Sequence, residues 1–169
     1  MRQRVMWVLL FSAVTVVTVL YFARNVWATP ANGFAATTLA LGRFGEIDVF
    51  NQLPQDGNVW LSLQKTKAAS DLYVQSNVWQ PGGSTGWHTH PGHSLIIVTA
   101  GAVTAYEGND RDCKPSVYTQ GMGFVDPGGD HVHILRNEGI VEARTIAVQL
   151  IPAGAVRRFD AQSPGYCPF

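Results

Sequence analysis

The sequence has few charged residues and no excess of either sign. Asp, Glu, Lys and Arg make up only 14% of the 169 residues, and the 12 basic residues equal the 12 acidic ones. Binding to nucleic-acid phosphates needs clustered cations, and no basic stripe occurs, so a nucleic-acid-binding function is not expected. The chain also has no P-loop, no Gly-x-Gly-x-x-Gly motif and no evident Ser-His-Asp arrangement, which argues against nucleotide-dependent enzymes and serine hydrolases.

Helical periodicity is missing as well. Beyond the N-terminal segment no stretch keeps a 3.6-residue apolar period over ten residues, whereas 17 Gly and 9 Pro indicate frequent turns. Short β-type runs between turn signals predict strands at 47–50, 58–64, 71–79, 94–99, 102–106, 123–125, 131–135 and 141–151. An all-β sandwich or closed barrel is therefore predicted, because these folds hide the edges of their sheets.

Two local patterns give finer predictions. The run from Leu95 to Val98 is apolar at every position, which is typical of a central strand buried on both faces. The turn residues Asn137 to Gly139 predict a hairpin, so that strands 131–136 and 141–151 are expected to pair directly.

One long apolar run exists, at the N-terminus. Residues 5–23 carry no charge and follow Arg2 and Arg4, and Val26 and Ala28 fit a signal-peptidase site. Residues 1–28 are thus interpreted as a cleaved signal peptide or, because the run nearly spans a bilayer, as an uncleaved membrane anchor. Either alternative predicts an exported protein, secreted or tethered to the membrane by residues 5–23. The small residues of 29–45 are interpreted as a tether, and 46–169 as one domain.

Cysteine is nearly absent. Cys113 and Cys167 are the only two, and both follow the leader. An even pair in an oxidising compartment predicts one disulfide, with two unrelated thiols as the alternative.

All five histidines fall in two short windows: His88, His90 and His93, then His131 and His133. In a strand, residues two apart project from the same face, so each His-x-His pair can aim two imidazoles at one point. If the two strands face each other, three or four ring nitrogens converge, which is the ligand set of a metal site. The alternative is that the histidines are structural, hydrogen-bonded to one another and to the backbone.

At these residues the sequence resembles the cupin superfamily. The first cupin motif is matched by Gly82, His88, His90 and Gly101, with Ser94 in the position of the motif's Glu. The second motif is matched by Gly121, Pro127, Gly129, His133 and Asn137, with one extra residue before His133. The resemblance covers roughly residues 75–150 and implies a cupin-type double-stranded β-helix, or jelly-roll, barrel.

The resemblance also implies one metal ion, held by His88, His90 and His133 inside the barrel. Ser94 is a poor ligand, so His131, or as a second choice His93, is expected to fill the fourth position, and Asp130 is a further oxygen donor to consider. An all-imidazole site suits a divalent Zn, Fe, Cu or Ni ion. The family is often dimeric, so a homodimer is a further expectation.

Three aromatic residues and one glutamine are candidates for contact with a small-molecule ligand. Trp79 and Trp87 bracket the first motif, and Tyr106 and Gln149 lie on predicted strands. The alternatives are that the tryptophans are packing residues and that Gln149 faces solvent or orients a ligand histidine. Three functions follow: a metal-dependent enzyme, a non-catalytic metal- or ligand-binding module, and a metal-free structural barrel.

Overall fold

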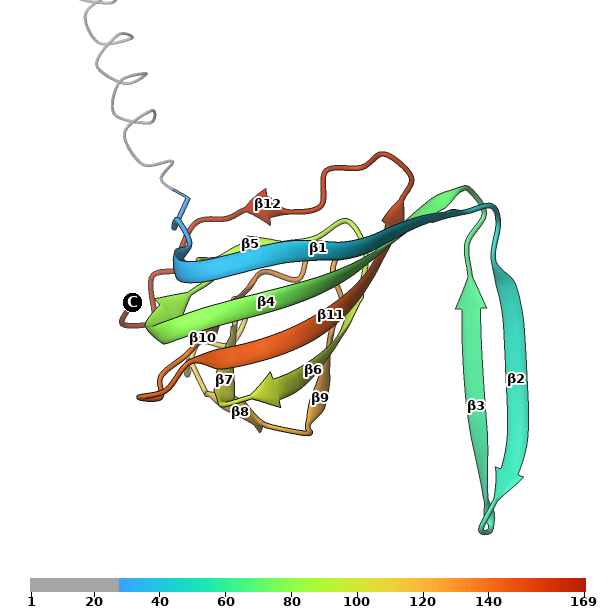
Figure 1. Ribbon diagram of the computed structural model, residues 1–169, viewed down its shortest axis with the longest axis horizontal. Coiled ribbons are helices and arrows are strands. Elements are labelled where there is room, and N and C mark those ends of the chain that lie inside the picture. Colours follow the sequence, from blue (N-terminus) through green and yellow to red (C-terminus); the bar gives the residue numbers. More distant parts are fainter. Residues whose placement is uncertain (1–27) are drawn as a thin grey trace, which may run out of the picture.

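The computed structural model describes residues 28–169, which form strands joined by turns and contain no helix (Figure 1). No helix able to span a bilayer occurs in this part of the chain. The apolar segment 5–23 lies outside the described residues. The strands are β1 Asn32–Phe44, β2 Asp48–Gln55, β3 Asn58–Lys65, β4 Ser70–Ser84, β5 His88–Thr89, β6 Ser94–Ala100, β7 Ala102–Glu107, β8 Ser116–Thr119, β9 Gly123–Asp126, β10 His133–Arg136, β11 Ala143–Pro152 and β12 Phe159–Asp160.

Ten of these strands form one antiparallel sheet that curls into a nearly closed barrel. The order is β12-β5-β10-β4-β11-β6-β9, with β1 added along β4, β7 along β10 and β8 along β7. Figure 1 shows β1, β4 and β11 side by side on one wall of the barrel, with β7, β8 and β9 beyond them. The all-β jelly-roll barrel predicted from the sequence is confirmed.

The segment interpreted as a tether is part of this sheet. β1 pairs with β4 along almost its whole length, from Phe34 opposite Trp79 to Phe44 opposite Ser70. The sequence hides this strand because most of its residues are small and exposed, so it shows no alternation between apolar and polar positions. The barrel therefore begins at β1, before the expected boundary at residue 46.

Strands β10 and β11 do not pair, contrary to the prediction from the Asn137–Gly139 turn. β4 lies between them in the sheet. Asn137 explains the crossing, because its Nδ2 donates to the carbonyl oxygens of Trp79 and Val141 at 3.1 and 2.8 Å. The turn is thus bound across the end of β4 and does not close a hairpin.

The prediction that β6 is buried on both faces is also wrong. Ile96 and Val98 point into the barrel, but Leu95 and Ile97 are each more than half exposed. The neighbouring β9 and β11 continue this outward face, and no other element of the described chain covers it.

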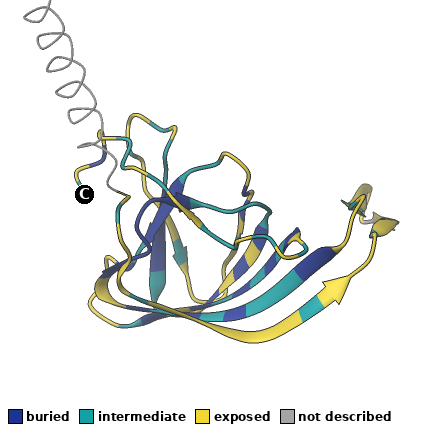
Figure 2. Cartoon of the chain, turned by 90° about the horizontal axis from the view of Figure 1, so that it is seen from above, coloured by how far each residue is buried: buried dark blue, intermediate teal, exposed yellow. Residues whose placement is uncertain are grey.

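Strands β2 and β3 form a separate two-stranded hairpin that projects from the barrel (Figure 1). It joins the end of β1 to the start of β4, and Figure 2 shows it largely exposed. Its two strands pair with each other from Asp48 opposite Lys65 to Gln55 opposite Asn58.

The barrel contains two buried hydrophobic clusters. One is built on Trp79, Val103 and Leu135. The other is built on Trp87, Tyr106, Ile134 and Cys167. Cys167 forms the predicted disulfide with Cys113, which fastens the C-terminal segment to the loop after β7.

Candidate metal centre

Antiparallel pairing of two short strands brings the predicted ligands together. β5 and β10 pair with His88 directly opposite His133, and His90 follows two residues after His88. The ring centroid of His88 lies 4.8 Å from that of His90 and 4.3 Å from that of His133. One nitrogen of each of the three imidazoles lies within 4.8 Å of the others. The two His-x-His windows therefore do meet at a common point inside the barrel.

The second nitrogen of each ring is held by the backbone. Nδ1 of His88 lies 2.9 Å from the carbonyl oxygen of Gly86, and Nδ1 of His90 lies 2.6 Å from that of Arg157. Nδ1 of His133 lies 3.2 Å from the carbonyl oxygen of His131. A carbonyl oxygen only accepts, so each Nδ1 carries the proton and each Nε2 keeps a free lone pair. Metal-binding histidines use this arrangement to fix their tautomer.

Burial keeps these imidazoles neutral. Removal from water disfavours the charged form and lowers the pKa of His88, His90 and His133. The nearby charge of Asp126 opposes this effect at His90 and His133, where it raises the pKa. Because neutral imidazole is the metal-binding form, the site is ready to accept a cation without first losing protons.

Asp126, the last residue of β9, adds a carboxylate that the sequence analysis missed. Its Oδ2 lies 3.4 Å from Nε2 of His90 and 3.7 Å from Nε2 of His133. Oδ1 accepts from the backbone N–H of Gly128, whereas the buried Oδ2 has no hydrogen-bond partner. An unpaired carboxylate oxygen is costly in a dry interior, and a cation at this point would remove the cost.

The cross-strand register explains how Asp126 reaches the site. β6 pairs with β9 so that Ser94 lies directly opposite Asp126. Both residues are buried, 4% exposed, and line the same cavity. The carboxylate therefore comes from the strand beside the position where the first cupin motif has its Glu.

The other predicted fourth ligands are placed less favourably. Nε2 of His131 lies 2.6 Å from Oε2 of Glu107 and is thus already paired, although His131 forms a possible ligand group with Asp126 and His133. His93 lies in the loop before β6, outside both groups. Asp130 is exposed in the turn before β10. Asp126 is thus the better-placed fourth donor.

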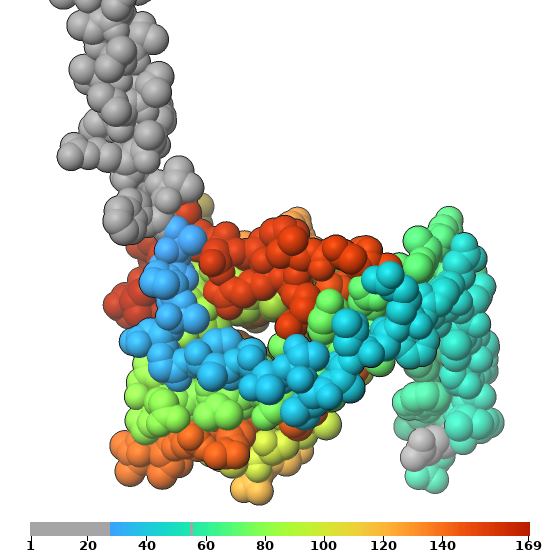
Figure 3. All heavy atoms as spheres, turned by 45° about the horizontal axis from the view of Figure 1, so that its top comes forward, coloured from blue at the N-terminus to red at the C-terminus, as the bar shows by residue number. Residues whose placement is uncertain are grey.

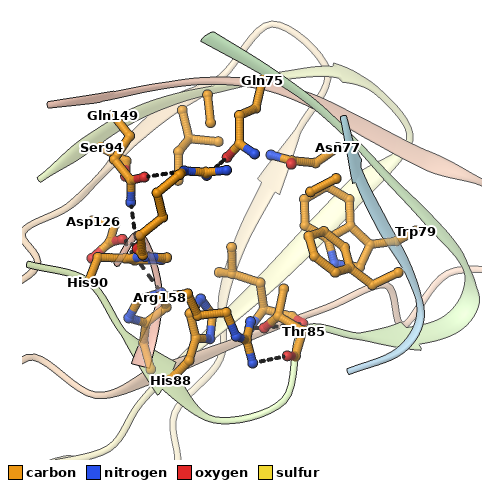
Figure 4. Close-up of a pocket in the computed structure, with 17 residues that line it drawn as sticks. Gln75, Asn77, Trp79, Thr85, His88, His90, Ser94, Asp126, Gln149 and Arg158 are labelled. Carbon is orange, nitrogen blue, oxygen red and sulfur yellow. Dashed lines mark hydrogen bonds and ion pairs between the residues drawn. The ribbon is translucent and has the colours of Figure 1, made fainter. Parts of the chain in front are cut away.

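A cavity of about 160 Å³ adjoins the histidines (Figure 4). Part of its wall is polar because inward positions of β4 and β11 hold Gln75, Asn77 and Gln149. Trp79 lines it on the side away from Asp126 and His90 (Figure 4), and Arg157 and Arg158 also line it. Figure 3 shows the surface hollowed between β1 and the C-terminal segment.

Of the predicted ligand contacts, Gln149 and Trp79 line this cavity. Trp87 and Tyr106 do not, because they pack with Phe169 in the second hydrophobic cluster. Trp87 is fully buried there, and the Tyr106 hydroxyl donates to the Glu138 carboxylate. The packing alternative therefore describes Trp87, whereas Gln149 faces the interior and not solvent.

The donor set fits a divalent transition metal. Three neutral imidazole nitrogens with a free lone pair lie close together, and the unpaired Oδ2 of Asp126 lies 3.4 and 3.7 Å from two of them. Nitrogen and carboxylate donors in this number are used by Zn, Fe and related ions.

Fold and site together define a class: a small β-barrel with a histidine cluster inside it. Residues 77–149 match the sequence profile of the Cupin domain family, and this segment runs from β4 to β11 across both motifs. This match supports the resemblance to the cupin superfamily over these residues.

Solved structures with the same fold include the polyketide cyclase RemF from Streptomyces resistomycificus. It is 16% identical over 82% of this chain and 80% of its own, with a TM-score of 0.51. The SPY1581 protein of unknown function from Streptococcus pyogenes is 16% identical over 72% of this chain and 76% of its own, with a TM-score of 0.45.

Oxalate oxidase is 22% identical over 48% of this chain, with a TM-score of 0.41. The match spans only 46% of the oxalate oxidase chain, less than half of that protein. Comparison with curated protein sequences finds no significant match.

Proposed function

We propose that this protein binds one divalent transition metal through His88, His90, His133 and Asp126 and acts as a metal-dependent enzyme on a small molecule. The observation that carries the proposal is the convergence of three neutral imidazoles, with the unpaired Oδ2 of Asp126 3.4 and 3.7 Å from Nε2 of two of them. The adjoining cavity supports a reaction and not mere metal storage, because it leaves room for a ligand beside the ion.

A metal held by these residues would supply Lewis-acid activation of an oxygen atom of the substrate. The protein residues have simpler tasks. The carbonyl oxygens of Gly86, His131 and Arg157 orient the imidazoles, and the strand pair β5–β10 keeps the ligands in register. The apolar side chains of Ile96 and Leu135 line the cavity and limit the access of water.

A non-catalytic binding module is the second candidate. Among the described residues that line the cavity, Asp126 is the only carboxylate, so no separate acid or base is available once Asp126 binds the ion. This observation favours a protein that holds a metal or a small ligand without transforming it.

We also propose that the domain works outside the cytoplasm, secreted or tethered to the membrane by residues 5–23. The Cys113–Cys167 disulfide supports this location because disulfides persist in oxidising compartments.

Metal analysis of the full chain tests the proposal. After purification without chelators or a histidine tag, the wild type should carry about one metal ion per chain, and His88→Ala and His133→Ala should lose it. His93→Ala is the matched control because His93 lies outside the cluster, and it should keep the metal. A metal-free wild type, or equal loss in the control, would disprove the site.

Turnover separates the enzyme from the binding module. Oxygen consumption and product formation should be screened with the metal-loaded protein over aromatic, thiol and keto-acid substrates. Turnover that His133→Ala abolishes supports the enzyme, and a silent screen with full metal content supports the binding module.

A further inference from the structure

Arg157 lies beside the cavity and has no counter-ion among the described residues. It lies in the segment between β11 and β12, it is half-buried, and it lines the cavity. Its Nε donates to Oε1 of Gln149 at 3.1 Å, and its Nη2 donates to Oε1 of Gln75. Both partners are uncharged. Within residues 28–169, no carboxylate forms an ion pair with Arg157.

The surroundings of Arg157 hold it in place without neutralising it. Gln75 and Gln149 are 7% and 2% exposed and belong to the adjacent strands β4 and β11. The guanidinium also stacks over the ring of Tyr73, 4.6 Å from its centroid. Holding a partly desolvated charge against neutral groups costs free energy unless an anion completes the site.

The neighbouring Arg158, in contrast, pairs with a carboxylate. Its Nε lies 2.5 Å from Oδ1 of Asp160, and its Nη2 donates to the carbonyl oxygen of Thr85. Arg158 is therefore neutralised by the chain itself, and Arg157 is not.

The charge balance of the cavity also calls for an anion. Its histidines are neutral, Asp126 is its only carboxylate among the described residues, and Asp126 is used by the proposed metal. A divalent ion together with Arg157 leaves an excess of positive charge in a site with few water-exposed groups. Guanidinium groups bind carboxylates through two parallel hydrogen bonds, and Arg157 has donors to spare beyond the two it uses.

The size of the cavity limits what this anion can be. A cavity of about 150 Å³ holds one benzene molecule, so about 160 Å³ fits roughly six non-hydrogen atoms. On the far side Trp79 is 1% exposed, and its indole N–H has no hydrogen-bond partner. A ligand with a second oxygen atom could accept from it.

We infer that the cavity binds a short organic acid, of about six non-hydrogen atoms, whose carboxylate pairs with Arg157. A hydroxyl or carbonyl oxygen on the same molecule would accept from the indole N–H of Trp79. The inference rests on the proposed function, because the acid is the small molecule that occupies the space beside the metal.

Lactate and its neutral isostere lactamide are suitable probes, because they have the same size and differ in charge. Calorimetry on the zinc-loaded full chain should show lactate binding at least about tenfold more tightly than lactamide. The larger 3-phenyllactate should not bind, because it is about twice the size that the cavity admits.

Variants of Arg157 assign the effect to this side chain. Arg157→Gln should weaken lactate binding at least about tenfold and leave lactamide unchanged, and Arg157→Lys should recover part of the loss. Its backbone carbonyl still holds His90, so metal content and circular dichroism should stay at wild-type values. The control is Arg144→Gln, which removes an exposed arginine of β11 paired with Glu142.

Equal binding of lactate and lactamide, or equal effects of Arg157→Gln and Arg144→Gln, would overturn the inference. The same titrations on metal-free protein separate it from the proposed function. Lactate binding that depends on Arg157 in a protein that never holds a metal would support the anion site and refute the metal proposal.

Discussion

In the proposed metal site, the carboxylate donor stands at position 126 on β9 and not at position 94 on β6. The serine on β6 leaves a gap where a carboxylate is expected, and Asp126 on β9 points its unpaired Oδ2 toward the same histidines. Since the two positions face each other across one ladder, the carboxylate keeps its place in space while its place in the sequence changes by 32 residues.

This exchange predicts that metal affinity depends on Asp126. Asp126→Asn should lower the affinity for zinc by at least about tenfold, because it removes the negative donor but keeps an oxygen to accept from Gly128. Competition with a chromogenic chelator measures the affinity. Asp130→Asn, in the exposed turn nearby, is the control and should bind as the wild type does.

A double variant examines the same idea from the other strand. Ser94→Glu combined with Asp126→Ser returns the carboxylate to β6 and should bind zinc more tightly than Asp126→Asn does. Wild-type affinity in Asp126→Asn alone would show that the carboxylate is not a ligand.

Three residues of the proposed metal site were predictable, and the fourth was not. His88, His90 and His133 follow from the two-residue period of a strand and from motif spacing, which are properties of the local sequence. Asp126 depends on the register between β6 and β9, and Arg157 depends on the path of the C-terminal segment. Neither leaves a periodic trace in the sequence.

Apolar alternation predicted where most strands lie in the sequence, but it did not predict which face of a strand points into the barrel. On β4 the residues Val74 and Val78 are half-buried on the outer side, whereas Gln75 and Asn77 face the barrel interior. A barrel that encloses a polar site inverts the usual assignment of faces. β1 went unrecognised for a related reason, because a strand with little buried surface has no hydrophobic pattern.

The ion pair that links β1 to β4 predicts that the free energy of unfolding depends on pH. The Arg43 guanidinium donates to both carboxylate oxygens of Asp71, at 2.7 and 2.8 Å, and the Gly154 N–H adds a third bond at 2.8 Å. The Arg43 hydrogen bonds, followed by the one from Gly154, lower the pKa of Asp71 to about 2. Because the pKa is lower in the folded state, the stabilisation is complete above about pH 4 and is lost as the pH falls toward 2.

Urea unfolding of wild type and Asp71→Asn between pH 2 and 6 measures this effect. The difference in the free energy of unfolding should be largest above about pH 4 and should shrink toward pH 2. Arg43→Gln should lose part of the dependence, since Gly154 still donates to the carboxylate. A difference that stays constant over this range would contradict the assignment.

The C-terminal segment predicts a second, pH-independent contribution to stability. The disulfide closes a separation of 54 residues, and Phe169 then packs on Tyr106 with ring centroids 4.8 Å apart. By the chain-entropy relation the crosslink stabilises the fold by about 4 kcal/mol. Replacing both cysteines by serine should lower the free energy of unfolding by about that amount in urea titrations, whereas deletion of Phe169 alone should cost less. An unchanged midpoint in the serine variant would show that the crosslink is not structural.

Taken together, the exposed surfaces of the protein point to self-association. The outer face of the barrel carries a row of directly paired apolar residues, Val74, Val148, Leu95 and Val125, one on each of four adjacent strands. The projecting hairpin is apolar as well, and seven of its side chains are 46–64% exposed: Val49, Phe50, Leu53, Val59, Trp60, Leu61 and Leu63. Apolar patches of this extent are uncommon on monomers.

A twofold dimer would cover both surfaces, with the hairpin of each copy against the outer face of the other. A stable interface of standard size buries roughly 800 Å² per partner. We therefore expect a dimer in sedimentation velocity across a dilution series.

A short Gly-Ser linker in place of residues 46–67 should give a monomer that keeps the fold, because Phe44 and Ser70 already face each other across β1 and β4. Leu95→Lys should also give a monomer, and Val117→Lys, on β8 away from the row, should not. A wild type that stays monomeric at every concentration would contradict the expected dimer.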